Sequence, residues 1–179
     1  MKKKQLLGAA LALIVLGNSC KNDDYRDMEL ENKGQVQFTS SIGENVGTRV
    51  TGNAWDSNDA IGVFMKQGAG LTAPLAINKK FTTGGNGNFS ATGTDVINYP
   101  ETGSVDFIAY YPYQSDLSGT VLPVSVASQA NLAAIDVMYA NNATGLTKTT
   151  PTANLVFSHK LAKIEFTVRG GAGVSDLTD

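Results

Sequence analysis

The chain has 179 residues, of which 42% are hydrophobic and 17% are charged, and its formal net charge is −2. Residues 1–19 hold three of the 14 basic residues, so the rest of the chain has 11 basic and 16 acidic residues, a net charge of −5. This acidic balance argues against a nucleic-acid partner, which needs clustered positive charge. The single cysteine excludes a disulfide framework, so packing must hold the fold together.

Residues 1–19 have the pattern of a lipoprotein signal peptide. Three lysines precede an apolar run over residues 6–16, and small residues then lead to Cys20. This run is too short to cross a bilayer core, which takes about 20 helical residues. We therefore expect cleavage before a lipidated Cys20, which attaches the chain to a membrane. A free exposed thiol is the alternative, and Gly17 departs from the pattern because a branched apolar residue is usual three places before the cysteine.

A polar stretch follows the cysteine. Asp, Glu, Lys and Asn dominate residues 20–34, so little of this stretch can be buried and we expect a flexible tether. The cluster Lys21-Asn22-Asp23-Asp24 resembles the surface-export tag of Bacteroidota lipoproteins, which would place the protein outside the outer membrane. A solvated tether that only clears the lipid headgroups is the alternative.

From residue 34 onward the apolar residues mostly recur with a period of two, which indicates strands with one buried face. Val36 and Phe38 alternate with polar residues, and the same pattern occurs at residues 61–64 and 124–126. A nearly continuous apolar stretch at residues 105–111 indicates a strand covered on both faces. Short strands with frequent glycine turns predict an all-β fold, an antiparallel sandwich.

Two segments between these strands need separate interpretation. Gly84-Gly85-Asn86-Gly87-Asn88 superficially resembles a phosphate-binding loop, but the following lysine and helix are missing, so we predict a turn. Residues 128–139 are ambiguous, because Leu132 and Ile135 fall at helical spacing behind a possible cap at Ser128. We expect at most a short helix or a turn at the rim of the sandwich.

Near the C-terminus, one face of a predicted strand carries Leu155, Phe157, His159 and Leu161. The next apolar residues, at positions 164, 166 and 168, have the opposite parity, so we expect a bulge or bend near Ala162. The sandwich domain is thereby assigned to residues 35–168. Residues 169–179 look like the start of a second domain that is missing or truncated.

The sequence offers little for catalysis or for metal binding. His159 is the single histidine, and its position on an apolar strand face favours a hydrogen-bonded core or rim residue over a general base. No G-x-S-x-G nucleophile motif is present. A metal site is not expected either, because the sequence has only one histidine and its cysteine is committed to lipid. It also lacks an Asp-rich calcium loop. We therefore expect no enzymatic activity and no cofactor.

Aromatic residues could form a sugar-binding platform if their faces were exposed together. Alternation predicts that Tyr110 and Tyr111 face opposite sides of their strand, so these two cannot share a platform. Core and rim packing is the favoured interpretation for the candidate rings, which are Trp55, Tyr99, Tyr110, Tyr111, Tyr113 and Tyr139.

Four segments carry a further pattern: residues 55–64 (WDSNDAIGVF), 105–112 (VDFIAYYP), 136–140 (DVMYA) and 155–164 (LVFSHKLAKI). Their order and spacing resemble the N-terminal domain of the fimbrillin family, the stalk, anchor and tip subunits of Bacteroidota pili. Asn58 departs from the family pattern, which usually has Gly there. Family members also carry a second sandwich domain, and this chain ends where that domain should begin.

The resemblance implies a transthyretin-like Greek-key β-sandwich in a lipid-anchored outer-membrane lipoprotein. It also implies that an arginine-specific protease removes an N-terminal segment, after which a strand from a neighbouring subunit fills the vacated position. The function implied is a structural and adhesive subunit of a cell-surface pilus (fimbrium), whose partners are other fimbrillin subunits and host or bacterial surface ligands. A surface glycan-binding lipoprotein is the alternative.

Arg49 is the candidate processing site. It lies in Val46-Gly47-Thr48-Arg49-Val50-Thr51-Gly52, a glycine-flanked segment after the strand with Val36 and Phe38. Proteases cut such exposed loops preferentially. Cleavage at Arg26 is an alternative, but it would sever only the tether and leave that strand attached. An uncut surface arginine is the third possibility.

Overall fold

The computed structural model describes residues 34–43, 54–162 and 171. The strands are β1 (Gln37–Ile42), β2 (Ala60–Lys66), β3 (Ala76–Thr83), β4 (Asn88–Ser90), β5 (Asp106–Tyr111), β6 (Met138–Ala140) and β7 (Thr152–His159). Two short helices, η1 (Gly93–Asp95) and α2 (Leu132–Ile135), complete the described elements. The prediction of an all-β fold is confirmed for this part of the chain. The predictions for Cys20, Arg26, Arg49 and the signal peptide fall outside the described residues.

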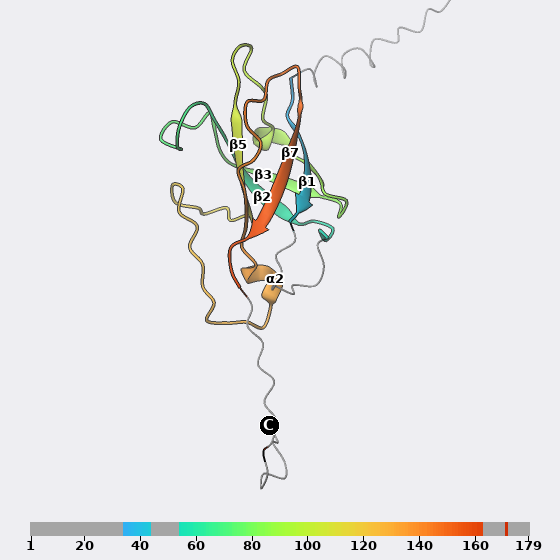
Figure 1. Ribbon diagram of the computed structural model, residues 1–179, viewed down its shortest axis with the longest axis vertical. Helices are drawn as coiled ribbons and strands as arrows, with labels where there is room; N and C mark the ends of the chain where they lie inside the picture. Colours follow the sequence, from blue (N-terminus) through green and yellow to red (C-terminus); the bar gives the residue numbers. More distant parts are fainter. Residues whose placement is uncertain (1–33, 44–53, 163–170, 172–179) are drawn as a thin grey trace, which may run out of the picture. The chain divides into compact units, whose positions relative to one another are not determined.

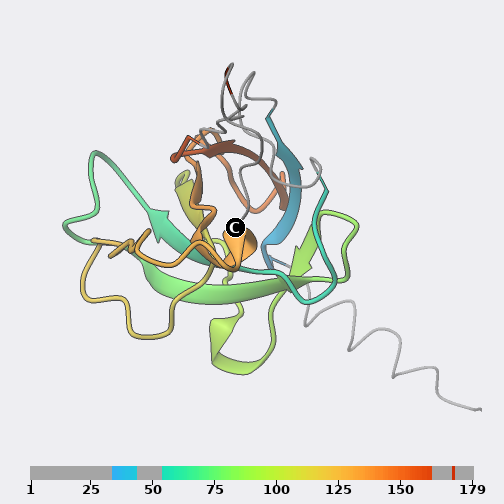
Figure 2. The same ribbon diagram turned by 90° about the horizontal axis from the view of Figure 1, so that it is seen from below.

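The strands form a closed barrel in the order β1-β4-β3-β2-β5-β6-β7, with β7 paired back to β1 (Figure 2). β1 and β7 are parallel and lie side by side in Figure 1, whereas the other pairings of the described barrel are antiparallel. The predicted transthyretin-like sandwich is not confirmed, since β1 bonds to both β4 and β7 and joins all strands into one sheet. The alternating pattern identified strands and faces but carries no information about which strands pair.

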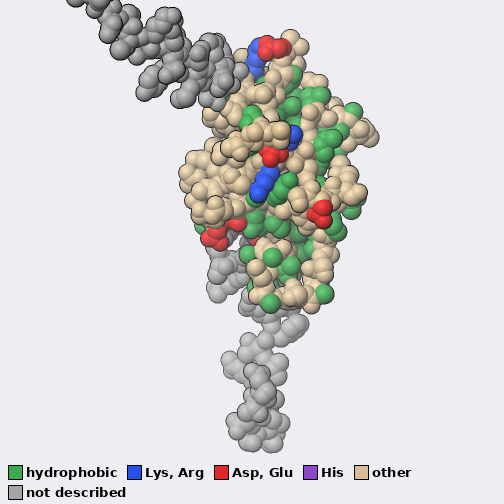
Figure 3. Space-filling view, turned by 180° about the vertical axis from the view of Figure 1, so that it is seen from behind, with side chains coloured by type: hydrophobic (Ala, Val, Ile, Leu, Met, Phe, Trp, Pro, Cys, Tyr) green, Lys and Arg blue, Asp and Glu red, His purple; other side chains and the backbone are tan. Residues whose placement is uncertain are grey.

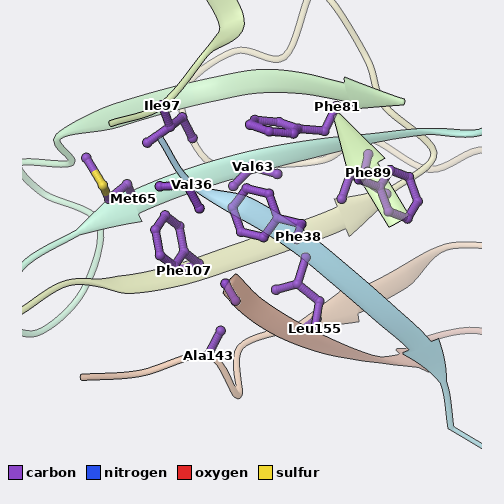
Figure 4. Packing of buried hydrophobic residues seen from close by; sticks show 14 of the residues in the cluster. Val36, Phe38, Val63, Met65, Phe81, Phe89, Ile97, Phe107, Ala143 and Leu155 are labelled. Carbon is purple, nitrogen blue, oxygen red and sulfur yellow. The ribbon is translucent and has the colours of Figure 1, made fainter. Parts of the chain in front are cut away.

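Aromatic rings fill the centre of the barrel (Figure 4). Phe38 of β1 lies edge-on against Phe81 of β3 and Phe107 of β5, with ring centroids 4.8 and 5.1 Å apart. Edge-to-face pairs of this kind add about 0.5–1.5 kcal/mol each beyond the effect of burying their area. The first strand therefore contributes a side chain to the middle of the core.

The glycine-rich segment between β3 and β4 is a turn, as predicted, and Gly85 and Gly87 have positive φ angles of 102° and 78°. Glycine suits both positions because it adopts this backbone conformation without steric cost. On the face in Figure 3, charged side chains are few, and some of them lie in pairs of opposite charge among hydrophobic and uncharged polar groups.

Two predicted details are wrong. Residues 124–126 form no strand, and Val124 and Val126 are 45% and 52% exposed in the long connection from β5 to α2. The cap of α2 is Asn131, whose side chain accepts a hydrogen bond from the Ala134 N–H, and not Ser128. Alternation over three residues does not make a strand when no neighbouring strand offers hydrogen bonds.

The face predicted for the C-terminal strand is correct as far as His159. Leu155 and Phe157 are fully buried, but β7 ends at His159 and Leu161 is 36% exposed. Beyond the strand end the alternation no longer fixes the direction of a side chain. The bend expected near Ala162 involves the apolar residues at 164, 166 and 168, which lie outside the described residues.

Candidate functional site

The first strand and the position that it occupies in the barrel form the candidate site. The alternation predicted for this strand is confirmed, because Val36 and Phe38 are 3% and 1% exposed while Gln37 is exposed. Burial of a Phe side chain contributes about 1.5–3 kcal/mol relative to exposure. Burial of these two side chains thus holds the first strand in the core, in addition to its backbone hydrogen bonds.

β7 binds β1 along its whole length. The parallel register runs from Gln37 opposite Thr152 to Ile42 opposite Phe157. Hydrogen bonds continue this pairing at both ends, from the Gln37 N–H to the Pro151 carbonyl (3.0 Å) and from the Gly43 N–H to the Phe157 carbonyl (2.8 Å). β7 therefore provides a continuous backbone edge that is complementary to one extended strand.

The opposite edge of β1 is paired much less completely. Its register with β4 covers only Phe38 opposite Phe89 and Thr39 opposite Asn88, and the Ser40 hydroxyl donates to the Gly87 carbonyl at 3.0 Å. A surface hollow of about 600 Å³ lies between β1 and β4. It is lined by residues of these two strands and of the turn before β4. The pairing of β1 with β4 is therefore weaker than its pairing with β7.

Tyr99 anchors the N-terminal end of β1. Its N–H donates to the Gly34 carbonyl at 2.8 Å, and its hydroxyl donates to the Thr150 carbonyl at 3.3 Å, next to the start of β7. Burial raises the pKa of the Tyr99 phenol to about 12, because the phenolate is poorly solvated there. Tyr99 therefore ties together the segments that lead into β1 and β7.

Trp55 lies at the junction of the strands around β1. Its indole packs edge-on against Phe89 of β4, Phe157 of β7 and Tyr111 of β5. The Tyr111 hydroxyl donates to an Asp59 carboxylate oxygen at 3.0 Å, and burial, with a smaller contribution from Asp59, raises the pKa of Tyr111. The prediction that Trp55 packs in the core is confirmed.

The tyrosines follow the predicted distribution between core and rim. Of the five tyrosines in the described residues, Tyr99 and Tyr110 are buried and the other three are half-buried. Tyr110 and Tyr111 face opposite sides, since Tyr111 contacts Trp55 in the core while Tyr110 packs near Phe64 on the outside of the sheet. The candidate rings for a sugar platform are therefore not gathered on one surface.

His159 is a hydrogen-bonded histidine at the end of β7, as predicted. Its Nδ1 lies 2.7 Å from a carboxylate oxygen of Asp136, and both side chains are buried. The neighbouring Ser158 hydroxyl donates to the Tyr139 carbonyl at 3.4 Å. These contacts fasten the end of β7 to β6 and to the end of α2.

Residues 34–43, 54–162 and 171 contain no group of three His, Cys, Asp or Glu side chains placed to hold a metal ion. No helix among them is both long and apolar enough to span a membrane.

Sequence reasoning identified β1 but missed its partners. Pairing of residues 37–42 with residues 152–157 leaves no local signal, because the two segments are far apart in the sequence. The contact of Trp55 with both flanking strands was also missed. The short β4 carried no separate signal beyond the glycine-rich turn before it.

A fimbrillin-like family model matches residues 48–179. A curated Bacteroides uniformis protein, named as a candidate fimbrium subunit (Fim1C), is 35% identical over 184 residues, which cover 100% of this chain and 59% of that protein. This chain thus spans less than two thirds of its relative.

Two solved structures are also similar, and both are described as candidate cell adhesion proteins. The Bacteroides uniformis structure is 33% identical, with a TM-score of 0.55 over 71% of this chain and 48% of that chain. The Bacteroides ovatus structure is 26% identical, with a TM-score of 0.50 over 70% of this chain and 52% of that chain. Because the family model matches well over half of the residues, the chain belongs to the fimbrillin-like family.

Proposed function

We propose that this chain belongs to a subunit of a cell-surface fimbrium and that the subunit assembles by exchanging β1 for a strand of a neighbouring subunit. Family membership and the fimbrial relative support the first part of this proposal. The chain covers 59% of that relative, so the role of the whole protein belongs to the proposal. The proposed role is structural and adhesive, not enzymatic.

The position of β1 is the observation that carries the proposal. β1 is the first described strand, and its removal would leave β2–β7 joined in one chain. It would also leave unpaired edges on β4 and β7 and uncover the rings of Phe81 and Phe107. Such an edge above an apolar groove is relieved when another extended chain pairs there. Assembly would then need no external energy source.

Cleavage at Arg49 is the proposed trigger. Arg49 lies between Gly43, which ends the pairing of β1 with β7, and Ala60, where β2 begins. A cut there would separate β1 from the rest of the barrel, whereas a cut at Arg26 would leave β1 attached. This placement supports Arg49 as the site for an arginine-specific protease.

Lipid attachment at Cys20 completes the proposal. The signal-like residues 1–19 and the polar residues after Cys20 support an outer-membrane lipoprotein exposed at the cell surface. We also propose that the whole subunit has the sandwich architecture of the family and a second domain. Its adhesive role would involve ligands on host or bacterial surfaces. The glycan-binding alternative receives no support from Trp55, whose indole is buried.

The test begins with treatment of the full chain and of the R49A and R26A variants with an arginine-specific protease. The new N-termini are then read by mass spectrometry. We expect a mature N-terminus at Val50 for wild type and R26A, and none there for R49A. A different mature N-terminus in wild type would contradict the role of Arg49.

The second step tests exchange itself. A labelled synthetic peptide with the sequence of residues 35–43 is offered to cleaved and uncleaved protein. We expect one peptide to be retained per cleaved chain and none by uncleaved chains. A mutant peptide with Ala at the position of Phe38 should bind more weakly. Equal retention by cleaved and uncleaved protein would contradict strand exchange.

A further inference from the structure

β7 has a second edge, which faces away from β1. β6 pairs with this edge only at Met138 opposite His159 and Tyr139 opposite Ser158. Beyond β6 the chain stays beside β5, where the Phe107 N–H donates to the Ala143 carbonyl at 2.8 Å. Within the described barrel, no strand therefore covers the N-terminal part of β7 on this side.

The side chain of Asn142 occupies this gap. The Val156 N–H donates to Asn142 Oδ1 at 2.8 Å, and Asn142 Nδ2 donates to the Asn154 carbonyl at 2.9 Å. A primary amide offers one acceptor and two donors in a plane, as neighbouring peptide groups of a strand do. Asn142 thus makes the two hydrogen bonds that a pairing strand would make at this point.

We propose that Asn142 blocks strand addition on the β6 side of β7, so that a partner strand pairs with β7 only in the position of β1. This inference rests on the proposed strand exchange. An unpaired strand edge is a template for any extended chain. Val156 is 42% exposed, so an apolar side chain would favour such an addition.

Addition on the β6 side would not assemble the protein productively. The position of β1 lies above the groove that Phe38 fills, whereas the second edge adjoins the segment that follows β6. A strand bound there could gain backbone hydrogen bonds but could not replace Phe38 in the core. Asn142 therefore determines which edge of β7 is available, while the vacated groove determines which side chains fit.

The first test uses the intact chain and does not require cleavage or exchange. Amide hydrogen exchange at Val156 is compared in wild type, N142A and N142D, with N141A as the control for the adjacent exposed asparagine. We expect exchange at Val156 to be about five- to tenfold faster in N142A, the ratio expected for loss of one hydrogen bond. N142D keeps an acceptor for the Val156 N–H but cannot donate to the Asn154 carbonyl, so its exchange rate at Val156 should lie between those of wild type and N142A. Unchanged exchange in N142A would overturn the inference.

The second test offers the 35–43 peptide, carrying a photo-crosslinker, to uncleaved wild type, N142A and N141A. We expect N142A alone to crosslink at residues 152–156, because its β1 position is still filled. Faster exchange at Val156 without crosslinking would also overturn the inference, since Asn142 would then only stabilise β7. Failure of cleaved wild type to retain the peptide would instead contradict the proposed function.

Discussion

The indole ring of Trp55 packs edge to face against the ring of Phe157, with centroids 5.2 Å apart. It meets Phe89 in the same way at 5.0 Å. Phe157 belongs to β7 and Phe89 to β4, so the single tryptophan contacts both strands that flank β1. Its fluorescence should therefore respond when these two strands separate.

We expect release of β1 to shift the emission of Trp55 to longer wavelength, because water would reach an indole that is only 7% exposed in the closed barrel. The measurement is a fluorescence spectrum before and after cleavage between β1 and β2. Addition of the 35–43 peptide should restore the original spectrum. An unchanged spectrum after verified loss of β1 would mean that β4 and β7 stay closed without it.

The F38A variant should lose much of the stability of the barrel. Truncation of a buried Phe to Ala typically costs about 3–5 kcal/mol, since a cavity replaces the ring contacts with Phe81 and Phe107. The free energy of unfolding is measured by denaturant titration. Q37A is the matched control on the exposed face of the same strand, and it should stay within about 0.5 kcal/mol of wild type. Similar values for both variants would contradict the placement of Phe38.

The G62A variant tests the close approach of Tyr110 to β2. A Cβ at residue 62 would overlap the ring of Tyr110. The ring cannot move freely, because its hydroxyl donates to Asn78 Oδ1 at 2.7 Å. Overpacking of this kind typically costs about 1–3 kcal/mol, and the shift is read as a lower midpoint of thermal unfolding. G84A, where a Cβ meets no atom within 4 Å, should change the midpoint little.

Breaking the pair of His159 and Asp136 should destabilise the end of β7. A buried polar group left without its partner typically costs about 1–3 kcal/mol, so H159L leaves Asp136 with an unsatisfied carboxyl group. The H159L/D136L double variant removes both polar groups and should recover part of the loss. H159L, D136L and the double variant are compared by urea unfolding, so that the interaction of the two side chains can be separated from the single effects. A double variant as unstable as the sum of the single effects would show that the two side chains do not interact.

Stability at low pH should depend on Asp106. Its pKa lies below the ordinary value of 3.8, first because Lys66 donates a hydrogen bond to it and next because the Gly145 N–H does. A lowered pKa stabilises the fold above pH 3.8, and this contribution is lost as pH falls through the lowered pKa. Urea unfolding at a series of pH values should therefore give a shallower acid slope for D106N. K66M should give an intermediate slope, because the hydrogen bond from Gly145 is retained.

Individual strands could be predicted because their evidence is local. Val36 and Phe38 occupy alternate positions, and both point inward in the barrel. The opposite orientations of Tyr110 and Tyr111 follow from the same period of two. Alternation failed at Val124 and Val126, where no neighbouring strand supplies hydrogen bonds and the side chains stay exposed.

Closure of the barrel and the contacts of β7 could not be predicted, because they join distant segments. The pairing of Gln37 with Thr152 depends on how the intervening strands order themselves, which alternation does not encode. Asn142 gave no signal either, since an asparagine after a short strand looks like an ordinary turn residue. Its role is visible only from the two backbone groups that it contacts.

Thr39 and Asn154, which face each other across the parallel pair of β1 and β7, are 115 positions apart in the chain. Closing so long a loop has a large entropic cost, and contacts between distant segments form slowly. During synthesis, β1 can meet the short β4 early, but its longer pairing with β7 has to wait until nearly the whole domain has left the ribosome. We therefore expect the barrel to close late, which would keep the chain extended enough to pass through a narrow membrane pore if it is exported as proposed above.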